Sequence, residues 1–113
     1  MPLKLDDHAT EQGTFHVVCA FEDEDDAGIA PATLAWTLTD RDGNTVNGRS
    51  AVAVASPATS NTVTLYGTDL ALIAGQTNER IFLIEWTYDS PYGTGLPGKE
   101  QATFIIDPLK AVS

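Results

Sequence analysis

The sequence predicts an all-β fold, a single antiparallel β-sandwich of about seven short strands. Its 113 residues suffice for one domain, and 42% of them are hydrophobic, which is enough for a core. Apolar and polar residues alternate with a period of two in several runs, as expected for strands with one buried face. Turn-forming residues separate these runs about every 8–12 residues, and no amphipathic helical run of useful length occurs. A parallel α/β topology, which needs crossover helices, is therefore excluded, and a small β-barrel is the main alternative.

The two predicted strands of the N-terminal half span residues 14–22 and 33–39. One face of each is apolar, formed by Phe15, Val17, Cys19 and Phe21 in the first strand and by Leu34, Trp36 and Leu38 in the second. Five consecutive acidic residues at 22–26, followed by glycine and proline, predict a loop between the two strands. Asp42-Gly43 after the second strand predicts a hairpin turn.

The C-terminal half contains the remaining predicted elements. In chain order they are a short strand over 51–55, a strand over 61–66, a helical turn or sheet crossover over 67–75, a strand over 80–89, a Gly- and Pro-rich loop over 90–98, and a strand over 100–107. Thr68 or Asp69 is the expected cap of the helical turn. We expect one domain over 1–113, with an ordered core over 14–107 and a short tail at each end. The pattern is that of an immunoglobulin-like or fibronectin-III-like sandwich.

The charge of the chain limits its partners. Sixteen acidic and six basic residues give a formal net charge of −10. Binding to nucleic acid or to an anionic membrane surface requires clustered Lys and Arg, so we expect neither. A protein partner or self-association is the expected alternative, and docking to a basic partner should weaken with salt. The N-terminal residues lack the apolar core of a signal peptide, and no run approaches the ~20 apolar residues of a membrane span.

The sequence offers no catalytic constellation. Cys19 is the one cysteine and lies in an alternating run, so we expect a buried small side chain rather than a nucleophile. His8 and His16 are isolated, and no phosphate-binding or metalloprotease motif occurs. We therefore expect no enzyme activity, no cofactor and no metal site. Calcium binding by the acidic run 22–26 stays open as an alternative to a solvated loop, whereas the segment 40–44 fits a hairpin turn better than a calcium loop.

Two regions are candidate interaction surfaces. If Phe82, Ile84 and Phe104 point into the core, then Ile81, Leu83 and Ile105 point outward and form an apolar patch that isolated monomers usually avoid. Either a partner or another segment, such as the N-terminal Leu3 and Leu5, should cover that patch. Tyr92 lies in the predicted loop over 90–98, where a rigid amphipathic side chain suits recognition. Both Trp36 and Trp86 are expected in the core.

Three segments together resemble a known group of proteins. They are Leu34–Asn44 (LAWTLTDRDGN), Val63–Leu72 (VTLYGTDLAL) and Trp86–Pro97 (WTYDSPYGTGLP). They resemble the small immunoglobulin-like structural proteins of tailed bacteriophages and prophages, and the resemblance covers about residues 14–107. It implies a non-catalytic virion or assembly accessory protein, located in the host cytoplasm and then in the virion. The paired cysteines of antibody-type domains are absent. The alternative function is a carbohydrate- or cell-surface-binding accessory domain that uses Trp or Tyr in an end loop.

Overall fold

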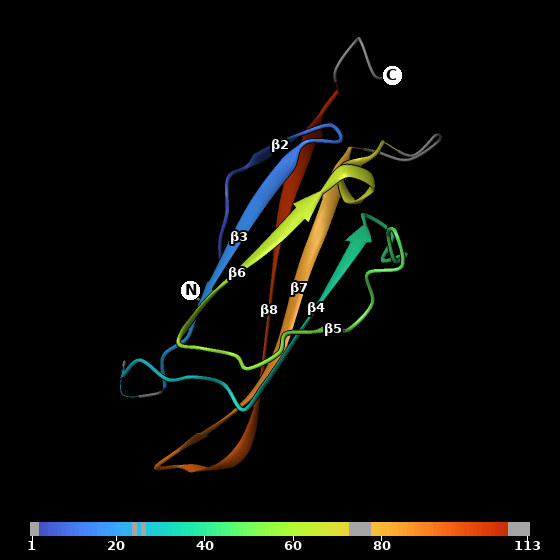
Figure 1. Ribbon diagram of the computed structural model, residues 1–113. Coiled ribbons are helices and arrows are strands. Elements are labelled where there is room, and N and C mark those ends of the chain that lie inside the picture. The colour runs from blue at the N-terminus through green and yellow to red at the C-terminus, as the bar shows by residue number, and fades with distance from the viewer. Residues whose placement is uncertain (1–2, 24, 26, 73–77, 109–113) are drawn as a thin grey trace.

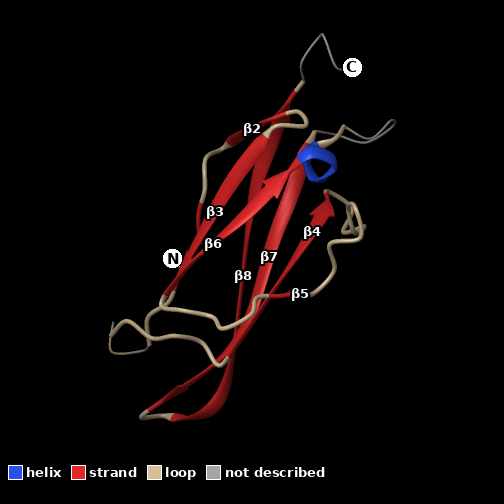
Figure 2. Ribbon diagram, in the orientation of Figure 1, coloured by secondary structure: helices blue, strands red, loops and turns tan. Residues whose placement is uncertain are grey.

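The computed structural model describes residues 3–23, 25, 27–72 and 78–108, and the fold is all-β (Figures 1 and 2). The elements are β1 (Leu3–Lys4), β2 (His8–Thr10), β3 (Thr14–Ala20), β4 (Thr33–Asp40), β5 (Val52–Ala53), β6 (Ser60–Tyr66), the 3₁₀ turn η1 (Gly67–Leu70), β7 (Glu79–Ser90) and β8 (Gly93–Asp107). The predicted strands at 14–22, 33–39, 61–66 and 80–89 correspond to β3, β4, β6 and β7.

The strands form two open sheets. One has the order β1-β3-β6 and the other the order β2-β8-β7-β4-β5. Neighbouring strands are antiparallel except β2, which pairs in parallel with β8. The expectation of a purely antiparallel fold is therefore wrong at β2. The described part of the chain contains eight strands, and about seven were expected. Neither sheet closes on itself, so the barrel alternative does not describe this fold.

The hydrophobic core lies between the two sheets. It is formed by the alternate, inward-facing residues of the strands, among them Phe15, Val17, Cys19, Leu34, Trp36, Leu38, Val63, Leu65, Phe82, Ile84, Phe104 and Ile106. Phe15 of β3 stacks on Phe104 of β8 with ring centroids 4.6 Å apart, which joins the two sheets directly. Trp36 stacks on Phe82 at 5.5 Å and is only 7% exposed. The period-two alternation thus identified the buried face correctly.

Aromatic packing also reaches the end of the core. Trp86 is partly buried against the core, and its ring centroid lies 5.0 Å from that of Phe21. At the other end, η1 follows β6 and carries the fully buried Leu70. The expected helical turn is therefore present as a single 3₁₀ turn. Part of the predicted 67–75 segment, residues 73–75, lies outside the described residues.

The hairpin of β7 and β8 is much longer than the sequence predicted. Residues 93–98, expected in a loop, continue the ladder, with Thr87 opposite Pro97 and Tyr88 opposite Leu96. Proline is tolerated there because β2 pairs only with the last three residues of β8, which leaves this part of β8 at the sheet edge. The hairpin extends beyond the other strands at one end of a molecule measuring 52 × 21 × 21 Å (Figure 1).

The N-terminal segment is part of the fold rather than a tail. β1 pairs with β3 through Leu3 opposite Cys19, and β2 places Ala9 beside Ile106. The chain thus crosses from one sheet to the other between residues 4 and 8. This crossing closes one side of the sandwich, which alternation in the sequence did not reveal because both strands are very short.

Candidate functional site

The predicted apolar patch lies on the outer face of the five-stranded sheet. Ile81 and Leu83 alternate along β7 with the fully buried Phe82, and Ile105 lies on β8 opposite Glu79. Residue 79 is two positions before Ile81 on the same face, so Ile105 is a diagonal neighbour of Ile81. The structure therefore brings the three aliphatic side chains together on one face. Their role in binding stays a prediction.

Flanking side chains reduce the exposure of this face. Ile81 lies between Thr39 and Thr103, whereas Leu83 lies between Thr37 and Gln101. Both aliphatic residues are half-buried, and Ile105 is 42% exposed. Ile81, Leu83 and Ile105 consequently form a narrow aliphatic row flanked by threonines, rather than a broad hydrophobic patch. The N-terminal leucines do not cover it, because Leu3 is buried in the core and Leu5 packs against the core.

A shallow hollow adjoins this row along β7. Its volume is about 340 Å³, and small side chains such as Ala35 and Ala53 line it. A hydroxyl pair, Thr33 and Thr87, lies 2.8 Å apart at its margin. The same region holds an exposed ion pair in which Lys99 Nζ lies 3.5 Å from Glu85 Oε2. The outer face therefore combines aliphatic side chains, hydroxyls and a concave region.

Tyr92 belongs to a different part of the molecule. With Pro91 it forms the two-residue tip of the β7–β8 hairpin, and it is 66% exposed. Leu83 pairs with Gln101, eight residues from the start of β8 at Gly93, so Tyr92 lies roughly 26 Å from the aliphatic row at about 3.3 Å per residue. The structure does not join Tyr92 and the row into one compact surface.

Tyr92 instead contacts the acidic loop. Its hydroxyl donates a hydrogen bond to Asp25 Oδ1 at 3.2 Å. The loop is organised by Asp23, whose Oδ1 accepts the N–H groups of Asp25 and Ala27 at 2.8 and 3.0 Å. The sequence did not predict this contact, because it joins residues 67 positions apart.

Metal binding by the acidic loop stays untested. Glu24 and Asp26, which belong to the predicted run 22–26, lie outside the described residues. Within the described part of the chain, no three His, Cys, Asp or Glu side chains are grouped to hold a metal ion. The second acidic segment, 40–44, is a turn held by its own carboxylate. Asp40 Oδ1 accepts the N–H groups of Asn44 and Asp42 at 3.0 and 2.9 Å, and these hydrogen bonds lower the pKa of Asp40.

A buried charge network was not found from the sequence. Asp69 of η1 is fully buried and accepts hydrogen bonds from Asn47 Nδ2 at 2.7 Å, Arg49 Nε at 2.7 Å and the Tyr66 backbone N–H at 3.2 Å. Burial raises the pKa of Asp69, but the Arg49 and Asn47 hydrogen bonds outweigh burial, so the pKa lies below its usual value. Arg49 also lies over the Trp36 ring, 5.7 Å from its centroid. These contacts hold the segment 41–51, which connects β4 to β5, against η1 at the end of the core, and the network therefore has a structural role.

Cys19 is buried in the core, whereas the two histidines lie on the surface. Cys19 is fully buried, and burial raises the pKa of its thiol to about 11. His8 Nδ1 lies 2.9 Å from Asp107 Oδ1, and His16 Nδ1 lies 3.1 Å from Thr64 Oγ1, both on the surface. His8 therefore contacts a carboxylate, and His16 contacts a hydroxyl group.

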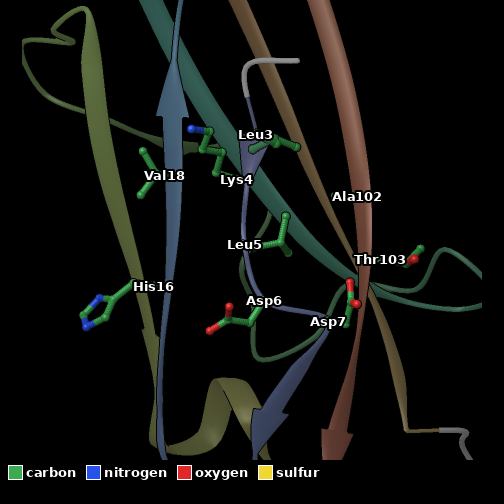
Figure 3. Close-up of a pocket in the computed structure, with 9 residues that line it drawn as sticks. All are labelled: Leu3, Lys4, Leu5, Asp6, Asp7, His16, Val18, Ala102 and Thr103. Carbon is green, nitrogen blue, oxygen red and sulfur yellow. The ribbon is translucent and has the colours of Figure 1, made fainter.

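The N-terminal crossing borders a second concavity. A groove of about 640 Å³ is lined by Leu3–Asp7 together with His16, Val18, Ala102 and Thr103 (Figure 3). Lys4 and Asp6 extend toward the β3 side, where His16 and Val18 lie, whereas Leu5 points away from it (Figure 3). The groove is wide open, and its charged lining consists of Lys4, Asp6 and Asp7.

Comparison of the chain with protein-family models, curated proteins and solved structures finds no match. Among the described residues, no helix is long and apolar enough to cross a bilayer.

Proposed function

We propose that this protein is a non-catalytic binding module that acts through protein–protein contacts on the outer face of its five-stranded sheet. The observation that carries the proposal is the joint placement of Ile81, Leu83 and Ile105 on that face, beside a hollow lined by small residues. Aliphatic side chains beside a concavity are typical of protein interaction sites. Threonine hydroxyls along the row supply hydrogen-bonding groups for a polar rim.

The charge of the protein defines the kind of partner. A net charge of −10 disfavours acidic surfaces and favours a neutral or basic protein. The aliphatic row supplies the desolvated contact, and the charge supplies long-range attraction that weakens with salt.

The proposal includes the immunoglobulin-like type of fold. Two features support it: the buried Trp36 on β4, at the centre of the sandwich, and the arrangement of β1, β3 and β6 against β8, β7, β4 and β5. With the resemblance of Leu34–Asn44, Val63–Leu72 and Trp86–Pro97 to small phage structural proteins, this type of fold leads us to propose a virion or assembly accessory protein of a tailed phage or prophage. Such a protein is made in the host cytoplasm and then joins the particle.

Particle binding tests the proposal. Tagged protein is produced in the host that carries the gene, phage particles are induced and sedimented, and the particle fraction is probed for the tag. We expect the wild-type protein in that fraction at a constant ratio to the particles. Leu83→Glu should abolish this association while leaving a folded protein, since Leu83 is only half-buried.

The matched control is Thr14→Glu, which adds the same charge at an exposed position on the outer face of the other sheet. It should sediment with particles as the wild type does. Absence of the wild-type protein from particles contradicts the virion proposal. Equal binding by Leu83→Glu and the wild type contradicts the proposed surface.

The second candidate is a carbohydrate- or cell-surface-binding domain, and the exposed Tyr92 at the hairpin tip is the observation that favours it. An exposed aromatic ring at the end of a sandwich provides a stacking surface for a sugar. Binding to a glycan array that disappears in Tyr92→Ala would favour this candidate over the first. An array without signal would remove it.

A further inference from the structure

We infer that the free edge of β6 is the site at which a second copy of this chain adds, by antiparallel strand pairing. The inference concerns the three-stranded sheet and is independent of the surface proposed above. β6 (Ser60–Tyr66) is the outer strand of the order β1-β3-β6, with β3 as its neighbour on one side (Figure 1).

The hydrogen-bond pattern shows which backbone groups face outward. The Phe21 N–H donates to the Thr59 carbonyl at 2.9 Å, and the Gly67 N–H donates to the Gly13 carbonyl at 3.0 Å. In an antiparallel ladder, hydrogen-bonded and non-hydrogen-bonded pairs alternate. The odd residues of β6 therefore bond to β3, whereas the N–H and C=O groups of Ser60, Thr62 and Thr64 point away from it. Among the described residues, no backbone hydrogen bond from another strand reaches these outward groups.

The other outermost strands are protected in ways that β6 is not. Unprotected edges invite pairing with another chain, and natural proteins shorten, cover or charge them. β1 and β5 are two residues long, and β2 is three. The longer edge of β8 contains Pro97, Lys99 and Glu100, and the N-terminal segment lies beside it through the hydrogen bond from Leu3 N–H to Glu100 Oε2 at 2.9 Å. β6 is seven residues long and has neither charge nor proline.

The distribution of acidic residues favours a second copy as the occupant. The strands of the three-stranded sheet, Leu3–Lys4, Thr14–Ala20 and Ser60–Tyr66, contain no Asp or Glu, although the chain carries sixteen. The strands of the five-stranded sheet contain six, namely Asp40, Glu79, Glu85, Asp89, Glu100 and Asp107. Two copies joined at β6 therefore meet where they repel each other least. They form one six-stranded sheet of the order β1-β3-β6-β6-β3-β1.

Symmetry limits the registers that this pairing can take. A two-fold axis makes each contact occur twice, and outward-pointing residues must pair with outward-pointing residues. The Tyr66 N–H already donates to Asp69 Oδ2, so only its carbonyl can accept from the second copy. The register that engages Ser60, Thr62 and Thr64 together with this carbonyl places Thr62 opposite Thr64 of the second copy. Cross-strand threonine pairs of this kind are favourable in sheets. The interface is a small one, so we expect a reversible dimer.

Sedimentation velocity over a range of concentrations tests the inference. We expect a monomer–dimer equilibrium that tightens as salt rises from about 0.05 to 0.5 M, because salt screens the repulsion between two acidic copies. A protein that stays monomeric at every concentration and salt level overturns the inference. So does a dimer that dissociates as salt rises.

Substitutions locate the interface. Thr62→Pro/Thr64→Pro removes outward N–H groups without removing a bond to β3, and should weaken the dimer at least about a hundredfold. The matched control, Thr62→Val/Thr64→Val, keeps the backbone donors and should dimerise as the wild type does. If the proline variant does not fold, Thr62→Lys/Thr64→Lys replaces it. That variant lowers the net negative charge yet places lysines opposite each other, so unchanged dimerisation overturns the inference.

Crosslinking tests the register. Chains carrying Thr62→Cys and chains carrying Thr64→Cys are mixed under mild oxidation, while the buried Cys19 stays out of reach. The paired positions lie about 5.5 Å apart between Cα atoms, within disulfide range, so the mixture should give a covalent dimer that neither variant gives alone. Equal crosslinking in all three samples contradicts this register. Leu83→Glu should dimerise normally, which separates this inference from the proposed function.

Discussion

Removal of the buried carboxylate of Asp69 should lower the free energy of unfolding more than a substitution of an exposed residue does. Asp69 is fully buried and accepts hydrogen bonds from Asn47, from two nitrogens of Arg49 and from the Tyr66 backbone N–H. Asp69→Ala deletes all of these acceptors. The donors Asn47 and Tyr66 lie in exposed residues and can bond to water instead.

The size of the effect depends on the cation left behind. Breaking a buried ion pair costs about 3–5 kcal/mol when the remaining charge stays buried. The Arg49 side chain is 31% exposed and can turn toward solvent, so we expect the lower end, about 3 kcal/mol. For a domain of this size that corresponds to a fall in Tm of roughly 12 °C.

Denaturant and thermal unfolding, followed by tryptophan fluorescence, measure this loss. Asp42→Ala removes an exposed acid from the neighbouring turn and should change stability by less than about 0.5 kcal/mol. Asp69→Asn should lower the free energy of unfolding nearly as much as Asp69→Ala does. The asparagine side chain would place its own N–H donors against the donors that now bond to the Asp69 carboxylate. A loss below about 0.5 kcal/mol for Asp69→Ala would refute the assignment of the network to fold stability.

Three further predictions concern packing, pH and thiol reactivity. Gly98→Ala should lower the free energy of unfolding by about 1–3 kcal/mol, since an added Cβ would lie 2.3 Å from Trp86 Cε2. This loss should be smaller when Trp86 is also replaced by leucine. An equal loss with and without Trp86→Leu would contradict the proposed clash. The pKa values of Asp69 and Asp40 are both lowered by hydrogen bonds in the folded state, so their stabilisation is present above about pH 4 and is lost as pH falls through the folded-state values. Urea titrations from pH 7 to pH 2 should show that fall, and Asp69→Asn should flatten it. Cys19, with its pKa raised to about 11 by burial, should resist a thiol reagent at pH 8 in the native protein and react fully in denaturant, whereas fast native labelling would contradict its position in the core.

Local patterning was sufficient to predict the central strands and their buried faces. Phe15, Trp36 and Phe82 each lie in a run of alternating apolar residues, and each is in the core. Alternation is a direct consequence of strand geometry, so it can be recognised in the sequence of one strand even when the neighbouring strands are unknown. The same alternation placed Ile81, Leu83 and Ile105 on the opposite, outer face.

Features that depend on distant parts of the chain were not predictable in this way. Three residues, His8–Thr10, are too few to show a period, and their parallel pairing depends on β8 nearly a hundred residues later. The strand over 93–98 was not predicted, because Gly and Pro usually indicate a loop and are tolerated in a strand only at a sheet edge. The Asp69–Arg49 pair and the Tyr92–Asp25 contact are likewise set by tertiary structure, not by local sequence.

The most direct test of the proposed binding surface is footprinting of the protein on and off the phage particle. Hydroxyl-radical labelling with mass spectrometry measures the solvent exposure of individual side chains. We predict that Ile105, Leu83 and Ile81 lose labelling in the particle-bound protein, while the exposed Tyr92 at the hairpin tip keeps it. Protection of Tyr92 alone, with unchanged labelling of the aliphatic row, would contradict the proposal that the outer face of the five-stranded sheet is the binding surface.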